Sequence, residues 1–379
     1  MELVKLSGTP YERGRLLGQR FRDTLGLVIE QNQRSLVVAL EAKGLAPLTE
    51  ERFNAMVRRG LPYTREYAPD LVEEVEGLAE GADLPFEAVY GLNYFLDFLD
   101  ITYPGLSNEL LFGCTTLAAT NRATADGRAY LGQNYDLLHL YQKGAILLQM
   151  EVAPGLEALV FTIVGLVGCA GMNAAGLGIV INNLIPTDSR PGVPYTFVLR
   201  KALAQRRISE AINTIWSAHR ASGINYLMAD GAGEVISLET TAMDADVIHG
   251  LDEYLGHSNH YVHPRLAAEY ASASRPYKGD SYMRWGRMNK LLKQQCGALN
   301  RESLMGILRD HAGYPYSICR HSLEGLDELR ADDTVASLLM DLRSLSMWIG
   351  TANPCQNPYG EFRLTPAEAT GQATAVMLA

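Results

Sequence analysis

The chain has 379 residues, 47% of them hydrophobic and 20% charged, which is typical of a globular protein with a sizeable core. Its net charge of −10, without a basic block, argues against nucleic acid or an anionic membrane as a partner. No signal-peptide core and no apolar run long enough to cross a membrane is present, so we expect a cytoplasmic protein.

The five cysteines are widely spaced and include no Cys-x-x-Cys pair, which disfavours both a disulfide framework and a thiolate zinc site. The sequence therefore predicts no metal and no cofactor. A lone cysteine is usually a small buried core residue. We interpret four of the five in this way: Cys169, Cys296, Cys319 and Cys355.

The first third of the chain has helical periodicity. Thr9 and Glu12 form a capping-box pattern around Pro10, which predicts that a helix begins at residue 10. Apolar residues at helical spacing predict further helices over 50–59, 63–80 and 85–98. None of these segments carries a chemical motif, so we interpret them as a packing layer.

The pattern changes to strands at residue 114 and remains strand-like to about 238, apart from a helical segment over 198–219. A helix is predicted over 281–295. Alternating runs over 334–342 and 346–351 predict a hairpin around Arg343 and Ser344. No linker or low-complexity segment divides the chain, so we predict one intertwined domain.

The strand-like region begins with a Gly113–Cys114 step, which suits a nucleophile that becomes an N-terminus. A cysteine reacts as its thiolate and needs a base. A free α-amino group, with a pKa of about 7.7 to 8.0, is such a base near neutral pH. Glycine lacks Cβ and leaves its carbonyl open to attack by the next thiol. Cleavage there would give chains of residues 1–113 and 114–379.

Asp136 is the acidic residue that this interpretation requires. A three-residue loop over 125–127 would join two antiparallel strands and place Asp136 opposite Thr116. Thr116 and Cys114 share a face, because strand side chains alternate. We therefore expect the Asp136 carboxyl diagonally across from the thiol. A register shifted by one residue would send it to the other face.

An ordered set of motifs resembles the N-terminal-nucleophile (Ntn) hydrolases of the acyl-coenzyme A:isopenicillin N acyltransferase family. The chain is more distantly similar to penicillin V acylases and bile salt hydrolases. The resemblance spans most of the chain. The motifs are GTPYERG at 8–14, GCTT at 113–116, GQNYD at 132–136, GMN at 171–173, GLG at 176–178, NN at 182–183, HSNH at 257–260, SICRH at 317–321 and TVAS at 334–337.

The resemblance implies an α+β fold, a four-layer αββα sandwich of two mainly antiparallel sheets with a helical N-terminal pro-segment. It implies self-cleavage before Cys114, which leaves residues 1–113 and 114–379 as an αβ heterodimer. Cys114 would be the nucleophile and Asp136 would hold its α-amino group. Asn259 would donate its amide to the oxyanion of the tetrahedral intermediate.

The resemblance also matches further residues of the candidate site, but it implies less specific roles for them. It suggests oxyanion or substrate contacts for Asn134, Asn183 and Arg284. Asn182 could make the same contact in place of Asn183. Alternatively, both side chains could only hydrogen-bond nearby main-chain groups. Gln133 stands where the distant hydrolases carry arginine, so their substrate-carboxylate contacts do not transfer. Arg284 and Arg287 match a basic pair whose role stays open.

The predicted function is therefore an amidohydrolase or acyltransferase that passes acyl groups of amides or thioesters through a Cys114 thioester. Its substrate is a small molecule that the sequence does not identify. Two alternatives remain open. One is a papain-like mechanism in which His257 or His260 is the base, and the other is a binding protein without catalytic activity. A metal site at His257, His260 and His263 is disfavoured, because neighbouring glycine and proline indicate a loop rather than a helix.

Overall fold

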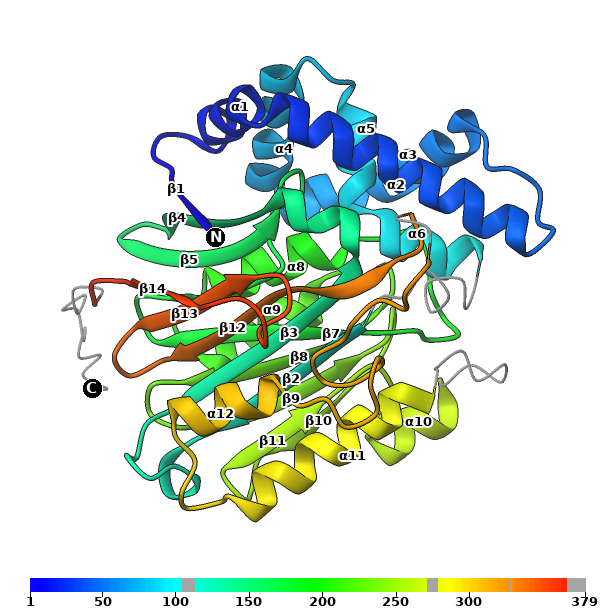
Figure 1. Cartoon of the computed structure of the whole chain (residues 1–379). Helices are drawn as coiled ribbons and strands as arrows, with labels where there is room; N and C mark the ends of the chain where they lie inside the picture. Colours follow the sequence, from blue (N-terminus) through cyan, green and yellow to red (C-terminus); the bar gives the residue numbers. More distant parts are fainter. Residues whose placement is uncertain (104–112, 271–278, 327–328, 367–379) are drawn as a thin grey trace.

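Two stacked β-sheets with helices on their outer faces make up the core of the protein (Figure 1). The computed structural model describes residues 1–103, 113–270, 279–326 and 329–366. The larger sheet has eight strands in the order β1-β4-β5-β6-β7-β8-β9-β10, and the smaller has six in the order β11-β2-β3-β12-β13-β14. Every strand pair in the described residues is antiparallel except β1 with β4.

The strands have the following bounds. The larger sheet contains β1 (Glu2–Lys5), β4 (Ala145–Ala153), β5 (Leu156–Ile163), β6 (Ala170–Asn173), β7 (Leu177–Leu184), β8 (Gly223–Asp230), β9 (Val235–Thr240) and β10 (Ala245–His249). The smaller sheet contains β2 (Gly113–Ala119), β3 (Tyr130–Leu138), β11 (Tyr254–His257), β12 (Asp332–Asp341), β13 (Ser346–Thr351) and β14 (Gly360–Arg363).

Helices cover both outer faces of this pair of sheets. Helices α8 (Tyr195–Leu203) and α9 (Ile208–Ser217) pack on β6, β7 and β8. Helices α11 (Gly279–Gln294) and α12 (Arg301–Leu308) pack on β2, β3, β11 and β12, while β2 and β3 contact β7. A short helix, α10 (Pro264–Glu269), follows β11. The order helix, sheet, sheet, helix confirms the predicted four-layer αββα sandwich.

The N-terminal helices gather beside the sandwich, at the top of Figure 1. They are α1 (Pro10–Arg20), α2 (Arg22–Ala42), α3 (Glu50–Tyr67), α4 (Pro69–Ala82), α5 (Phe86–Asn93) and α6 (Phe95–Thr102). The predicted capping box is confirmed, since Thr9 accepts from the Glu12 main chain and Glu12 accepts from that of Thr9. In the described residues no helix is long and apolar enough to span a membrane.

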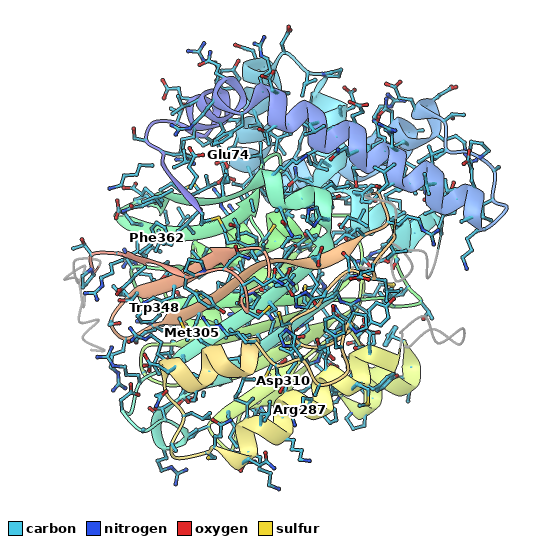
Figure 2. All side chains as sticks on the ribbon, in the orientation of Figure 1. Glu74, Arg287, Met305, Asp310, Trp348 and Phe362 are labelled. Atoms are coloured by element: carbon cyan, nitrogen blue, oxygen red, sulfur yellow. The ribbon has the colours of Figure 1, made fainter. Side chains whose placement is uncertain are left out.

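Glycines let α1 and α4 cross at backbone contact. A Cβ on Gly14 would lie 1.8 Å from the carbonyl oxygen of Glu74, and one on Gly77 would lie 2.1 Å from that of Tyr11. Glu74, labelled in Figure 2, also reaches across to α8, where its Oε2 is 3.3 Å from Nη2 of Arg200. The close crossing holds α1 against α4, and this buried ion pair ties the helical layer to the sandwich.

Three predicted helical segments are each divided into two helices, and one of them, over 198–219, is divided between α8 and α9. The segment predicted as one helix over 63–80 is divided between α3 and α4, with Ala68 at φ −143° and ψ 63°. Pro69 disfavours helical angles at the residue before it, which explains the break. The segment predicted over 85–98 is divided at Tyr94, which caps α5 and precedes α6. The predicted hairpin of β12 and β13 is confirmed.

Candidate active site at the start of strand β2

Gly113 and Cys114 open strand β2, which lies between β11 and β3 in the smaller sheet. Cys114 pairs with Tyr135, and Gly113 pairs with Asp136. The expected pairing of Asp136 with Thr116 is therefore wrong. Strand β2 ends at Ala119 and β3 begins at Tyr130, and a short 3₁₀ helix (Asn121–Ala123) occupies part of the connection where a tight three-residue loop was predicted.

The observed register places the thiol and the Asp136 carboxyl on opposite faces of the sheet. Cys114 shares the face of Thr116, whose Oγ1 donates to Oδ1 of Asn182 in the larger sheet at 2.8 Å. Asp136 shares the other face with Thr115, whose Oγ1 accepts from Nη1 of Arg284 in α11 at 2.9 Å. The thiol thus faces the space between the sheets, and the carboxyl faces the helix layer.

The main chain of Cys114 is held by three side chains. Its N–H donates to Oδ1 of Asn259 at 2.8 Å. Its carbonyl oxygen accepts from Nη1 of Arg284 at 2.6 Å and from Nδ2 of Asn182 at 3.1 Å. These bonds come from α11, β7 and the loop after β11, so three separate layers of the fold fix the position of this one residue.

Asn259 lies in the loop directly after β11 and is 5% exposed. Its main-chain N–H donates to Oγ of Ser281, 2.9 Å away, and its Nδ2 donates to the carbonyl oxygen of Asn183 at 3.1 Å. Its Oδ1 also accepts from Nη2 of Arg284 at 3.0 Å. The structure therefore brings the side chains of Asn259 and Arg284 to the main chain of Cys114. Asn183 contributes its main-chain carbonyl, and the neighbouring Asn182 contributes its side chain.

A buried cluster of charges surrounds Asp136. Its Oδ1 accepts from Oγ1 of Thr334 at 2.7 Å. Its Oδ2 lies 3.6 Å from Nε of Arg320 and accepts no hydrogen bond from a described residue. Arg320 also pairs with Asp332 at 2.6 Å and with Asp280. A Cβ on Gly113 would lie 3.2 Å from Asp136 Oδ2, so this oxygen is close to the Gly113–Cys114 junction.

Burial dominates the ionisation of this site. Burial, together with the charge of Asp136, raises the pKa of the Cys114 thiol to about 12. The thiol is therefore protonated at neutral pH and needs a base to react. Burial also raises the pKa of Asp136 to about 6, although Arg320, Arg284 and the bond from Thr334 act in the opposite direction. Asp136 is mostly ionised above that pH.

Two residues singled out in the sequence lie away from Cys114. Asn134 points to the face under α12 and donates from Nδ2 to the carbonyl oxygens of Leu308 at 2.7 Å and Ile318 at 2.8 Å. Its Oδ1 accepts from Oγ of Ser337, so both ends of the side-chain amide bond groups of the protein itself. Arg287 pairs with Asp310 at 2.6 Å in the outer helix layer (Figure 2).

The three nearby histidines bind separate partners. His257 places Nε2 2.7 Å from Oε1 of Glu239, and Nδ1 2.7 Å from the carbonyl oxygen of Ser258. His260 has Nδ1 2.8 Å from Oγ of Ser281. Burial, and then the neighbouring His257, lower the pKa of His260 to about 3, so it is neutral and a weak base.

His263 pairs separately, with Nδ1 3.3 Å from Oδ2 of Asp246. The three rings are thus directed toward different groups and do not converge on one point. This divergence agrees with the sequence argument against a metal site on these residues.

Arg320 and Thr334 stand within the quoted motifs without a predicted role, and Asn182 was only an alternative to Asn183. Arg320 and Thr334 could have been singled out in the sequence, because polar side chains that become buried in a fold need hydrogen-bond partners.

The prediction that four of the cysteines are buried core residues was partly wrong. Cys169 and Cys319 are buried, but Cys296 and Cys355 are exposed in segments that follow α11 and β13.

The Gly113–Cys114 step opens an inner strand of an αββα sandwich of two mainly antiparallel sheets. A sequence model described as "Acyl-coenzyme A:6-aminopenicillanic acid acyl-transferase" matches residues 122–356, more than half of the chain. The chain therefore belongs to the acyl-coenzyme A:6-aminopenicillanic acid acyl-transferase family, which is related to the Ntn hydrolases. The match begins after Cys114 and includes Asp136, Asn259 and Arg284.

Individual proteins resemble the chain to different degrees. The 40 kDa form of acyl-coenzyme A:6-aminopenicillanic-acid-acyltransferase from Emericella nidulans is 28% identical over 328 residues, which cover 85% of each chain. Among solved structures, a variant of conjugated bile acid hydrolase from Clostridium perfringens is 15% identical, with a TM-score of 0.45, and covers 69% of this chain and 100% of its own. Penicillin V acylase from Agrobacterium tumefaciens is 12% identical, with a TM-score of 0.43, over 63% of this chain and 83% of its own.

Proposed function

We propose that this protein is a self-cleaving cysteine acyltransferase or amidohydrolase in which Cys114, once it is an N-terminus, is the nucleophile. One observation carries the proposal. Oδ2 of Asp136 is buried, accepts no hydrogen bond from a described residue, and lies beside Gly113 at the peptide bond that would be cut. A buried carboxylate oxygen without a donor is costly unless a partner arrives later.

Cleavage would supply that partner. The Cys114 thiol would attack the Gly113 carbonyl carbon, and the bond from that carbon to the Cys114 nitrogen would break as the nitrogen takes up a proton. Water would then hydrolyse the thioester and release the Gly113 carboxylate. The new α-amino group would have more hydrogens to donate than the peptide N–H, which already bonds Asn259 Oδ1 at 2.8 Å. A further hydrogen could be directed to Asp136 Oδ2.

The same amine would then serve as the base for substrate. Its ordinary pKa of about 7.7 to 8.0 suits proton transfer from a thiol at neutral pH. Asp136, held by Thr334 and Arg320, would fix the position of the amine. Asn259 would stabilise the oxyanion through Nδ2, which donates to the Asn183 carbonyl oxygen at 3.1 Å, while Oδ1 of the same side chain accepts from the Cys114 N–H at 2.8 Å. Arg284 would orient both Cys114 and Asn259.

The substrate class follows from the thioester intermediate. An amide or thioester would acylate the thiol and release its amine or thiol, and the acyl group would then pass to water or to another amine. The relative from Emericella nidulans is named for acyl transfer from acyl-coenzyme A to 6-aminopenicillanic acid. The two outcomes differ only in the final acceptor, so this chain is proposed for acyl groups on amides or thioesters in general.

N-terminal sequencing of the purified protein tests the proposal directly. A second N-terminus reading Cys-Thr-Thr-Leu is expected beside the original one, and intact mass spectrometry should detect an acyl group on the Cys114 chain after incubation with acyl donors. A folded, active protein with the original N-terminus alone would refute the amine as base. A chain that neither cleaves nor takes up any acyl group would support a binding protein instead.

A further inference from the structure

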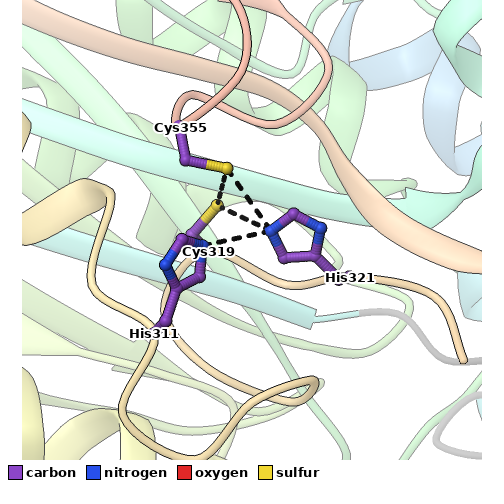
Figure 3. A group of neighbouring side chains, drawn as sticks. All are labelled: His311, Cys319, His321 and Cys355. Carbon is purple, nitrogen blue, oxygen red and sulfur yellow. Dashed lines mark hydrogen bonds between the residues drawn. The ribbon is translucent and has the colours of Figure 1, made fainter.

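A group of four side chains outside the candidate active site has the geometry of a metal centre (Figure 3). His311, Cys319 and His321 lie between α12 and β12, and Cys355 follows β13. One nitrogen or sulfur atom from each lies within 4.8 Å of the others. Segments separated in sequence thus direct two imidazoles and two thiols toward one point.

The distances in this group match a tetrahedral zinc site. Bonds of about 2.0–2.1 Å to nitrogen and about 2.3 Å to sulfur place tetrahedral ligands about 3.4 Å apart for two nitrogens, about 3.6 Å for nitrogen and sulfur, and about 3.8 Å for two sulfurs. The two Nε2 atoms are 3.1 Å apart. His321 Nε2 is 3.5 Å from Sγ of Cys319 and 3.4 Å from that of Cys355.

The two sulfurs are separated by 3.6 Å, and both cysteines are free. This separation is well beyond the bond length of about 2.05 Å in a disulfide, but it fits two ligands of one ion. We infer that His311, Cys319, His321 and Cys355 form a structural zinc site. Binding would release two thiol protons to solvent, so that two thiolates balance the charge of Zn²⁺.

Zinc is the ion that these ligands favour. Two thiolates and two imidazoles in tetrahedral geometry select Zn²⁺ over Mg²⁺ and Ca²⁺, which prefer oxygen. All four positions of the tetrahedron come from protein side chains, which is typical of structural rather than catalytic zinc. The surroundings also order the ligands, since the Cys319 N–H donates to the Asp310 carbonyl at 3.0 Å and the His321 N–H to that of Pro315 at 2.9 Å.

The proposed zinc would also position Arg320, which lies between two of its ligands. Arg320 donates from its main-chain N–H to Oγ1 of Thr334 at 3.0 Å, and Thr334 in turn bonds Asp136. Two ligands that flank Arg320 would therefore fix the arginine beside Asp136 Oδ2. Only this coupling depends on the proposed function. The presence of the metal does not.

The test measures zinc in the full-length chain, purified without a polyhistidine tag and without chelators. Inductively coupled plasma mass spectrometry should find close to one zinc per chain. Cys355→Ser and His311→Gln each change a ligand near the surface and should reduce zinc at least tenfold. Cys296→Ser changes an exposed cysteine outside the group and should retain the zinc of the original chain.

Two further measurements keep the result independent of how the variants fold. Replacement of zinc by Co²⁺ in the unsubstituted chain should give the visible bands of a tetrahedral site and a thiolate charge-transfer band. Zinc-free protein that still does not bind Zn²⁺ or Co²⁺ after reduction would overturn the inference. So would peptide mapping that finds Cys319 and Cys355 joined as a disulfide, or equal zinc in Cys355→Ser and Cys296→Ser.

Discussion

Cys114 and Cys319 are both buried, yet their surroundings differ in kind. Cys114 lies near Asp136, Gln133 and Arg284, and its thiol shares the space between two sheets. Cys319 faces a second thiol and an imidazole at hydrogen-bonding distances. The surroundings of Cys319 are those of the proposed metal ligand, whereas the main chain of Cys114 is fixed by Asn259, Arg284 and Asn182, as the proposed nucleophile requires. Depth of burial alone does not separate the two.

The largest expected effect separates these two cysteines. Cys114→Ala should remain a single chain and lose all turnover, because no thiol is left to form a thioester, while its zinc content stays that of the original protein. A denaturing gel, an activity assay and metal analysis measure the three quantities. Zinc loss in Cys114→Ala would mean that the two sites are not independent.

Asn259→Ala should lower kcat by roughly 100- to 1000-fold with KM little changed, the loss typical of an oxyanion donor. Steady-state kinetics on the cleaved enzyme measure it. Asn289→Ala is a suitable control, because among the described residues that side chain bonds only main-chain groups of Gly256 and Trp285. A loss confined to KM would identify Asn259 as a substrate contact.

Asp136→Asn should stabilise the uncleaved chain at neutral pH. The pKa of Asp136 is raised from 3.8 to about 6, so the folded chain binds this proton more tightly than the unfolded chain. The stability that the proton contributes is fully present below about pH 4 and is lost as the pH rises through about 6. Removing the charge should therefore add about 1 to 3 kcal/mol to the free energy of unfolding at pH 7.

Urea unfolding in a Cys114→Ala background measures this difference without interference from cleavage. The two proteins should converge in stability near pH 4, where Asp136 is protonated. If Asp136→Asn is instead less stable at pH 7, the carboxylate contributes to folding through Arg320 and the argument for a site that awaits an amine fails.

The smallest expected effect concerns the histidines. His260→Gln should keep activity within roughly tenfold, whereas removal of a general base costs about 100- to 10,000-fold. His257 needs a different design, because His257→Gln alone would remove the imidazole partner of the buried Glu239 carboxylate and leave it with the main-chain N–H groups of Val262 and His263. The double variant His257→Gln, Glu239→Gln removes both groups. Loss of turnover in a folded, cleaved His260→Gln protein would restore the papain-like mechanism.

Much of the fold was predictable because it depends on local periodicity. The capping box at Thr9 and the hairpin of β12 and β13 follow from side chains a few residues apart. The β2–β3 register was not predictable, since it depends on a 3₁₀ helix in the connection that turn rules do not capture. The break at Ala68 could have been recognised from Pro69.

The candidate site was predictable where residue type and motif sufficed, as for Cys114, Asn259 and Arg284. The position of the Asn134 side chain was not predictable from its residue type, because its place in strand β3 directs it to the face under α12. The four-residue metal group could not be read from spacing, since Cys355 joins His311, Cys319 and His321 only through the pairing of β12 with β13. A Cys-x-His step at 319–321 was its local signal.

Strand β1 has a practical consequence for anyone who produces the protein in pieces. It lies at the edge of the larger sheet and pairs in parallel with β4, with Leu3 opposite Leu147. A fragment that starts at residue 114 would lack this strand and expose the hydrogen-bonding edge of β4 to other molecules. Exposed edges of this kind promote aggregation. Residues 1–113 should therefore be co-expressed with the remainder of the chain, since they complete one of its sheets.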